Sequence, residues 1–392
     1  MLSATAPPAA GATGVGGSMG GGADGGAAGT TAGRACPQAT RPGRMSCQAV
    51  IRPGTPIGPA GGHADAPRPG AVRPNATPGG FGPADLHALY HLPGPPAGAG
   101  RTVAVVDAMD DPNAEADLAT YRSTFGLTAC TTANGCFRKV NQNGAPGPLP
   151  ASDPGWGLEV SLDLDMVSAV CPACHILLVE ATSPATNNLG AAENTAVRLG
   201  AHFIGNSYGE PEFPGDQTIG LEFYDHPGVA ITAPSGDSGF GVDFPASAVG
   251  VTAVGATTLS RDLGNRTRSE AAYSGGGCAS SPKPPWQQDT FCATRTLVDV
   301  AAIGDPNIGV AVYDTFGEPG FVVVGGVSVS AQIIAAVYAL AGIPPVGSQP
   351  ASFPYAHPGD LNDITRGPGA GPGYDEPTGM GTPNGVAAFR SP

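Results

Sequence analysis

Apolar runs and amphipathic stretches alternate along the chain from about residue 102 onward. Continuous apolar runs bounded by turn residues predict buried strands, and a period near four predicts helices. The predicted strands are 102–108, 175–181, 202–209, 228–235 and 249–255, and the predicted helices are 114–125, 158–170 and 188–199. Buried strands that alternate with helices predict an α/β fold: a doubly wound, mostly parallel sheet with flanking helices, with functional side chains at the carboxyl ends of the strands.

The first 80 residues show a different pattern. They are rich in Gly and Pro and have little amphipathic periodicity. Such a composition cannot bury enough apolar surface to offset the entropy of ordering the chain. We therefore expect residues 1–80 to be disordered or linker-like, and the folded domain to span residues 81–392.

One predicted helix, 158–170, carries two acids in a mostly apolar setting. Leu158, Leu162 and Met166 repeat every four residues, which is typical of a buried helix. Glu159 and Asp163 are also four residues apart, so their carboxylates share one face of the helix. Two neighbouring carboxylates repel each other, and one should keep its proton to a higher pH than a free carboxyl group. An exposed acidic face is the alternative, whereas a buried pair would indicate an active site.

Composition and charge exclude several classes of protein. The net charge of −14 disfavours nucleic acid as a partner, because phosphate binding needs clustered Lys and Arg. No apolar run is long enough to predict a transmembrane helix, so we expect no membrane partner. The N-terminus has neither a basic region nor a continuous apolar core, and it is not a recognisable signal peptide. We expect a monomer.

The eight cysteines fall into four close pairs in sequence, namely Cys36/Cys47, Cys130/Cys136, Cys171/Cys174 and Cys278/Cys292. An even number at short spacings favours local disulfides and an oxidising, extracytoplasmic compartment. The C-P-A-C sequence at Cys171–Cys174 leaves a redox motif or half of a zinc site open as alternatives.

Three further segments carry candidate chemistry. In 233–247 a predicted strand runs into a Gly-rich turn that displays Asp237, although Asp is also an ordinary turn residue. In 323–342 Ser328 follows a Gly-Gly turn and precedes an apolar helix, where it could act as a nucleophile or cap the helix. In 363–381 Asp363 and Asp375 flank a Gly-rich loop, which suits a hard cation such as calcium or forms a plain polar loop.

These segments together resemble the sedolisin family of serine-carboxyl peptidases, which have a subtilisin-like fold. The resemblance covers about residues 81–390 and follows the family's order of motifs. E-V-S-L-D resembles the family's Glu-x-x-x-Asp helix, S-G-D-S-G its oxyanion loop, and G-G-V-S-V-S-A-Q its nucleophile motif. The resemblance implies Ser328 as the nucleophile, Glu159 as the general base with Asp163 as its partner, and Asp237 in the oxyanion hole.

The resemblance also implies a cofactor and a substrate path. The segment D-I…G-P-G-Y-D is similar to the family's calcium loop. One Ca²⁺ would be bound by the side chains of Asp363 and Asp375 and by the carbonyls of Ile364, Gly371 and Gly373. N-S-Y-G at 206–209 resembles the strand along which the substrate backbone lies. The implied protein is a secreted endopeptidase acting on protein or peptide substrates, with its calcium loop at the C-terminal end of the 81–392 domain.

The residue types agree with work in acid. A serine hydroxyl is a weak nucleophile until a base takes its proton. Replacing the usual His by Glu159 moves the working range to acid, because a free Glu carboxyl titrates near about 4.3. Asp163 would hold Glu159 in place and share its proton. At low pH Asp237 would be a neutral acid that donates a hydrogen bond to the oxyanion.

Two alternatives remain. A subtilisin-type Asp-His-Ser peptidase could use Asp107, at the end of strand 102–108, but none of the seven histidines opens a helix in the expected context. A non-catalytic or weakly active relative could act as a secreted binding or scaffold protein. In its favour, the chain has Val327 where the family has Thr, and Gln332 where it has Pro. The family's long N-terminal propeptide is not evident in residues 1–80.

Overall fold

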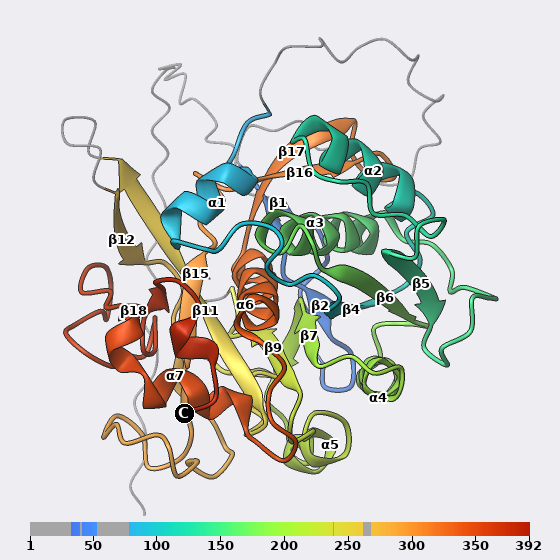
Figure 1. The fold of residues 1–392 in the computed structure, drawn as a ribbon. Helices are drawn as coiled ribbons and strands as arrows, with labels where there is room; N and C mark the ends of the chain where they lie inside the picture. The colour runs from blue at the N-terminus through green and yellow to red at the C-terminus, as the bar shows by residue number, and fades with distance from the viewer. Residues whose placement is uncertain (1–32, 40, 53–77, 238, 262–267) are drawn as a thin grey trace, which may run out of the picture. The chain divides into compact units, whose positions relative to one another are not determined.

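An eight-stranded sheet forms the centre of the fold (Figure 1) in the computed structural model, which describes residues 33–39, 41–52, 78–237, 239–261 and 268–392. The strand order is β12-β11-β9-β7-β4-β6-β5, and β15 also pairs with β11. Every pairing is parallel except that of β11 with β12. The predicted α/β class with a mostly parallel sheet is confirmed. The strands are β4 (Thr102–Ala108), β5 (Phe137–Asn141), β6 (His175–Ala181), β7 (Phe203–Asn206), β9 (Ala230–Pro234), β11 (Val251–Arg261), β12 (Arg268–Ala272) and β15 (Val300–Ile303).

Side chains alternate across this sheet and build a separate core on each face. In β4, Val103 and Val105 belong to one hydrophobic cluster, whereas Ala104 and Val106 belong to the other. Both faces are therefore buried, which explains why the strands read as continuous apolar runs. Asp107 lies in the same strand and is fully buried.

The helices divide between the two faces of the sheet. Residues of α1, α2, α3 and α6 pack into one cluster, and residues of α4 pack into the other, beside α5. In Figure 1, α3 and α6 lie next to each other over the middle of the sheet. The helices are α1 (Pro83–Leu89), α2 (Ala114–Thr124), α3 (Pro154–Val170), α4 (Thr186–Arg198), α5 (Asp216–Phe223), α6 (Val327–Ala341) and α7 (Phe353–Ala356), with 3-10 turns at Pro350–Ser352, Pro358–Asp360 and Ala387–Phe389.

Smaller sheets surround the central one. The sheet β1-β3-β17-β16 and the sheet β10-β8-β2 both include strands from the beginning of the described chain. Their strands are β1 (Gly33–Arg34), β2 (Ser46–Cys47), β3 (Val50–Ile51), β8 (Tyr208–Pro211), β10 (Asp243–Phe244), β16 (Val310–Asp314) and β17 (Gly320–Gly325). Two further pairs join β13 (Gly277–Cys278) to β14 (Thr296–Leu297) and β18 (Leu361–Asn362) to β19 (Thr382–Pro383).

The prediction of a disordered or linker-like 1–80 region is wrong for residues 33–52, and the folded part does not begin at residue 81. These residues add β1, β2 and β3 to two sheets, and Cys36, Met45 and Cys47 are buried in the core. Each strand has only two residues, so no periodic pattern marks it, and the partners of β2 and β3 on β8 and β17 lie far away in sequence. Residues 1–32 and 53–77, to which the same prediction applied, lie outside the described part of the chain.

The predicted strand 202–209 is divided in two. β7 ends at Asn206, inside the central sheet, and β8 begins at Tyr208 and pairs with β2 and β10 instead. The chain thus leaves the parallel sheet at Ser207. A single apolar run carries no signal for a change of partner, so the sequence pattern could not locate this break.

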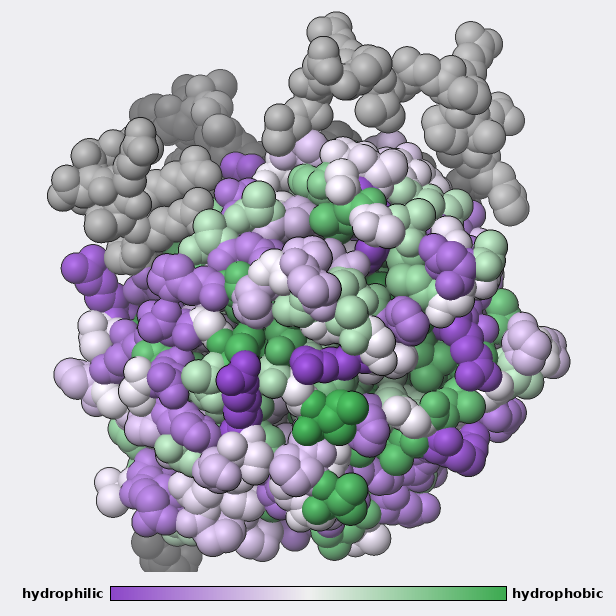
Figure 2. Space-filling model, in the orientation of Figure 1, coloured by the Kyte–Doolittle hydropathy of each residue, from purple (hydrophilic) through white to green (hydrophobic). Residues whose placement is uncertain are grey.

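The predicted disulfides are present. Bonds join Cys36 to Cys47, Cys130 to Cys136, Cys171 to Cys174, and Cys278 to Cys292. The zinc alternative for the C-P-A-C sequence is therefore not supported, and the burial of both cysteines disfavours the redox alternative. No helix in the described ranges is both long and apolar enough to span a membrane. On the face drawn in Figure 2, hydrophobic residues form small separate areas among hydrophilic ones.

Candidate active site

Helix α3 places the two predicted acids inside the protein. The Asp153 side chain accepts hydrogen bonds from the backbone N–H groups of Gly155 and Trp156, each at 3.0 Å, and Pro154 occupies the first turn. This is a strong helix start, because it satisfies donors that have no partner within the helix. Glu159 and Asp163 follow one turn apart and are both fully buried. The exposed acidic face is therefore excluded.

Helix α6 carries the candidate nucleophile in its first turn. Gly326 precedes the helix with a φ of 98°, a backbone conformation that glycine adopts readily. Ser328 is the second helical residue, and its hydroxyl lies 3.4 Å from the Ser207 carbonyl oxygen. Ser330 instead donates to the carbonyls of Ala302 and Ile303 at 2.9 and 3.1 Å, so it fastens the helix to β15. The two serines have separate surroundings.

Asp237 reaches the same helix terminus from the loop after β9. Its Oδ1 accepts the Val327 backbone N–H at 3.0 Å, and its Oδ2 lies 3.8 Å from the Arg34 guanidinium. Oδ2 is buried and receives no hydrogen bond among the described residues. Burial raises the pKa of Asp237 to about 7, against the lowering effects of the Val327 N–H and the Arg34 charge. In acid this side chain is therefore a neutral donor.

Glu159 sits between the nucleophile and the beginning of the described chain. Its Oε2 accepts the backbone N–H of Ala49 at 2.8 Å. Burial raises its pKa to about 8, a hydrogen bond from Ser328 opposes that rise, and the charge of Asp237 adds to it. Glu159 is thus placed to exchange a proton with Ser328.

Asp163 is held by two donors on its two oxygens. The Ser207 hydroxyl donates to Oδ1 at 2.8 Å, and the Gln332 amide donates to Oδ2 at 2.5 Å. Gln332 also donates to the Ser207 hydroxyl at 3.0 Å. Gly205 provides the space for this amide, since a Cβ there would lie 2.1 Å from the Gln332 Oε1. The departure from the family pattern at position 332 therefore supplies contacts that a proline could not make.

Asp107 extends the acidic group beyond Asp163. Burial raises the pKa of both side chains well above their usual range, and the negative charge of each neighbour adds to the rise. Apart from Asp163, no described residue donates a hydrogen bond to Asp107, whereas both Asp163 oxygens accept one. The hydrogen bond between the two carboxyls raises the pKa of Asp163 and lowers that of Asp107, so a proton shared by this pair is held on Asp163.

No ion pair among the described residues involves Glu159, Asp163 or Asp107. Three uncompensated buried anions would be very costly, so the group must hold protons well above the usual range for carboxyls. The arrangement can accept a proton from Ser328 and pass charge toward Asp107. The groups that perturb the pKa of Asp107 are carboxyls and do not include a histidine, which disfavours the Asp-His-Ser alternative.

Sequence reasoning missed several contributors to this site. Ser207, Gln332 and residues 48–49 contact the acids directly. Ser207 and Gln332 lie in segments that the resemblance matched, but neither was predicted to hold Asp163, and residues 48–49 belong to no catalytic pattern. Asp107 was considered only as the aspartate of the rival mechanism. A usable signal did exist for it, because it stands near the carboxyl end of a central strand.

The candidate calcium loop brings its two acids together. Asp375 Oδ2 accepts the Gly371 N–H at 2.9 Å, and Asp363 Oδ2 accepts the Gly373 N–H at 3.0 Å. Burial raises the pKa of Asp375, and the charge of Asp363 adds to that rise. A cation would relieve this repulsion, and the loop offers only oxygen ligands. The predicted set, which also includes the Ile364 carbonyl, therefore fits a hard cation in its chemistry.

The chain is similar to known peptidases in both sequence and fold. It is 28% identical over 366 residues to kumamolisin from Bacillus sp. (strain MN-32), in an alignment that covers 81% of this chain and 64% of kumamolisin. A Pseudomonas sedolisin, a serine-carboxyl proteinase, superposes with a TM-score of 0.67 and 22% identity, covering 79% of this chain and 96% of the sedolisin. The chain is therefore similar in sequence to a sedolisin-family peptidase, and it has the sedolisin fold. An S41 psychrophilic protease has the same fold with a TM-score of 0.52 and 20% identity, covering 76% of this chain and 96% of that protease.

No family profile matches the chain. The chain spans 64% of the length of kumamolisin, the curated relative that it matches.

Proposed function

We propose that this chain is a secreted serine-carboxyl endopeptidase that hydrolyses protein or peptide substrates in acid. The observation that carries the proposal is the contact between a helix-borne serine and a buried carboxyl group. The Ser328 hydroxyl lowers the pKa of Glu159 by hydrogen bonding to it, and no described cation neutralises that carboxyl. A serine beside a proton acceptor of this kind is an activated nucleophile.

Each proposed role follows from a contact. The Ser328 oxygen attacks the substrate carbonyl while Glu159 takes its proton. Asp163 and Asp107 share the charge that this transfer moves. Asp237, neutral in acid and beside the Val327 N–H, donates to the oxygen on which negative charge develops. Glu159 then returns its proton to the departing amine, and a water molecule repeats the sequence to release the acyl group.

Calcium is proposed for the C-terminal loop. Asp363 and Asp375 would hold the ion, with the carbonyls of Ile364, Gly371 and Gly373, and the ion would fix the loop in its folded form. The test is the melting temperature with and without a chelator at neutral pH. We expect chelation to lower it, because the ion binds only the folded state. Asp375→Ala should abolish the response to calcium. If chelation leaves the melting temperature of the parent unchanged, the loop does not bind calcium.

Export is proposed from the four disulfides, which form in oxidising compartments.

The decisive experiment is hydrolysis of a denatured protein across pH by the parent and by Ser328→Ala. We expect Ser328→Ala to be inactive and the parent to be active in acid and to lose activity as pH rises through about 7, because Asp237 then loses the proton that it donates to the oxyanion. A rate that rises through about pH 7 to 8 would point to a histidine base. A parent inactive at every pH would favour the non-catalytic binding protein, for which Val327 and Gln332 were the sequence argument.

A further inference from the structure

Glu193 is a buried carboxyl group that the proposed mechanism does not use. It lies in α4, on the face of the sheet opposite α3 and α6, and it is fully buried. Neither of its oxygens accepts a hydrogen bond from the described residues, and none of the ion pairs among them involves it. A charged carboxylate would be very costly in such surroundings. Glu193 is therefore built into the fold as a neutral acid.

Three polar side chains from three different elements face Glu193. They are Asn206 at the end of β7, Tyr208 at the start of β8 and Tyr224 directly after α5. Burial raises the pKa of Glu193 to about 8, and the Asn206 amide opposes that rise. Burial also raises the pKa of both tyrosines, and the charge of Glu193 adds to it. Elsewhere α4 packs on β4 and β6 through apolar side chains, so no described cation shares this cluster.

Hydrogen bonds join the side chains that face Glu193. The Tyr208 hydroxyl donates to Asn206 Oδ1 at 2.7 Å and lies 3.4 Å from the Tyr224 hydroxyl. The Asn206 amide donates to the Thr232 carbonyl at 3.2 Å. An ionised Glu193 would be a stronger acceptor than the Asn206 amide oxygen, and would compete with it for the Tyr208 proton. These hydrogen bonds therefore suit the neutral form of Glu193.

Ser207 stands between the two residues that this hydrogen bond joins. β7 ends at Asn206 and β8 begins at Tyr208, so Ser207 belongs to neither strand. Its hydroxyl donates to Asp163 at 2.8 Å, and its carbonyl oxygen lies 3.4 Å from the Ser328 hydroxyl. Neighbouring side chains of an extended chain point to opposite faces, so the neighbours of Ser207 are fixed on the α4 face while Ser207 serves the active site.

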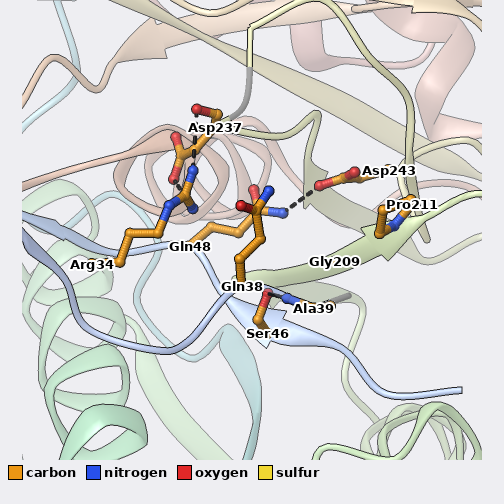
Figure 3. Close-up of a pocket in the computed structure, with 9 residues that line it drawn as sticks. All are labelled: Arg34, Gln38, Ala39, Ser46, Gln48, Gly209, Pro211, Asp237 and Asp243. Atoms are coloured by element: carbon orange, nitrogen blue, oxygen red, sulfur yellow. Dashed lines mark hydrogen bonds and ion pairs between the residues drawn. The ribbon is translucent and has the colours of Figure 1, made fainter. Parts of the chain in front are cut away.

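Strand β8 continues from Tyr208 into a small polar pocket at the active site (Figure 3). Gly209 and Pro211 of this strand line the pocket together with Asp237 and Asp243. Asp237 is the proposed oxyanion acid. The position of Tyr208 therefore bears on this pocket as well as on the residue before it.

We propose that Glu193 positions Ser207 from the opposite face of the sheet, and that it does so only while it carries its proton. The inference rests on the proposed peptidase function. The neutral acid leaves the Tyr208 hydroxyl on Asn206, which ties together the two neighbours of Ser207. When Glu193 loses its proton, the carboxylate draws the tyrosine hydroxyl away from Asn206. Ser207 is then no longer held in place, and its hydrogen bond to Asp163 weakens.

The first test is the pH profile of kcat/KM for a peptide substrate. Glu193→Gln cannot ionise and should match the parent in acid. Glu193→Leu removes the polar group, and should lower kcat/KM about tenfold and move the acid limb to lower pH, because Ser207 donates less well to Asp163. Glu222→Leu, at an exposed glutamate of α5, is the matched control and should behave like the parent. If Glu193→Leu does not fold, Tyr208→Phe removes the hydroxyl that joins the neighbours of Ser207 and should show the same shift.

The second test does not depend on activity and uses the inert Ser328→Ala protein. Its near-ultraviolet tyrosine absorbance should change in a step near pH 8, where Glu193 ionises beside two tyrosines, and the added change Glu193→Gln should remove that step.

Three results would count against the proposal. An equal absorbance step in both proteins would show that Glu193 does not ionise beside these tyrosines. If the parent is active and both Glu193→Leu and Tyr208→Phe keep its rate and pH profile, the positioning role is overturned and the proposed function stands. If the parent hydrolyses no peptide at any pH, the proposed function has failed and the positioning role fails with it.

Discussion

Helix α3 contributes carboxylates to two buried acidic groups that differ in what their oxygens contact. The first is the candidate active site, with Glu159 and Asp163. The second contains Asp165, only two residues later, together with Asp117 of α2 and Asp314 of β16, whose charges raise the pKa of Asp165 beyond the effect of burial. A helix turns by about 100° per residue, so Asp163 and Asp165 face different neighbours.

In the second group, backbone donors satisfy most carboxylate oxygens. Asp314 accepts the N–H groups of Phe316, Gly317 and Glu318 at 3.2, 2.9 and 2.8 Å. Asp117 accepts the Thr315 N–H at 2.7 Å. These contacts fasten the turn between β16 and β17, and one Asp165 oxygen is the exception without a donor.

In the first group, the carboxylates contact groups that can take part in a reaction. A serine hydroxyl meets Glu159, the Ala49 N–H comes from a segment in the cleft, and both Asp107 oxygens lack a donor other than Asp163 among the described residues. Burial raises pKa values in both groups, so a raised pKa does not by itself identify an active site. What distinguishes the first group is a nucleophile and access to a bound peptide.

The largest expected effect is a loss of turnover that occurs on substitution in the first acidic group and not in the second. Ser328→Ala should lower turnover by at least about 10⁴-fold, and Glu159→Gln should do about the same, because residues acting as one unit are not additive. Asp165→Asn should leave the turnover of the folded enzyme near that of the parent. The measurement is hydrolysis of a peptide in acid by each purified variant, with Ser330→Ala as the control on the same helix. A large loss of turnover in folded Asp165→Asn would erase the distinction.

The dependence of stability on pH should come from both groups. Asp111 belongs to the second group, because the charges of Asp314 and Asp117 add to the rise that burial causes in its pKa, to about 7. Burial raises the pKa of Asp237 to about 7 and that of Glu159 to about 8, whereas an unfolded Asp or Glu titrates near about 4. Between these values the native state binds more protons, so the free energy of unfolding is greatest below about pH 4 and falls as pH rises toward about 8. Each unit of pKa rise corresponds to about 1.4 kcal/mol for a group that titrates alone.

The check is denaturant unfolding of Ser328→Ala, which cannot digest itself, from about pH 4 to about pH 8. Asp111→Asn should make the decline shallower, because it removes one titrating group. A stability that increases over this range would contradict the raised pKa values.

Asp314→Ala should affect stability and leave catalysis intact. It removes the acceptor of three backbone N–H groups at a buried turn, which should cost about 2 to 4 kcal/mol. Denaturant unfolding measures the loss, and the turnover per folded molecule should stay near that of the parent. Retention of parental stability would show that the second group is not structural.

The smallest effect concerns Gln332, a positioning residue for Asp163. Gln332→Met keeps a similar volume but removes the donor to Asp163 Oδ2, so Asp163 should bind a proton more readily. With less negative charge beside it, Glu159 should lose its proton at a lower pH, and the acid limb of the kcat/KM profile should move to lower pH. We expect a loss of about tenfold at the optimum.

Gly205→Ala provides an independent route to the same result, because its Cβ would displace the Gln332 amide. It should move the acid limb in the same direction. Gln332→Pro, which restores the family residue, should also lose activity here. If the pH profile of kcat/KM is unshifted in both Gln332→Met and Gly205→Ala, Gln332 only fills space and does not position Asp163.

The sequence by itself determined the features that depend on neighbouring residues. β4 and β6 have the predicted bounds, and the buried helix with Glu159 and Asp163 is α3. These were readable because burial on both sheet faces leaves a continuous apolar run, and one buried helix leaves a period near four. The disulfides were readable because each joins cysteines close together in sequence. The Gly-Gly turn before Ser328 is likewise a local signal.

Only the tertiary structure decided which distant groups meet at the site. Strands β2 and β3 have two residues each and no period of their own, and their partners on β8 and β17 lie more than a hundred residues away. Gln332 looked like a weakened motif until the fold placed its amide on Asp163. Asp163 and Asp165 are nearly adjacent in sequence, yet one faces the catalytic group and the other faces a turn. Local pattern reports burial and periodicity, whereas the partner of a buried polar group is set by long-range packing.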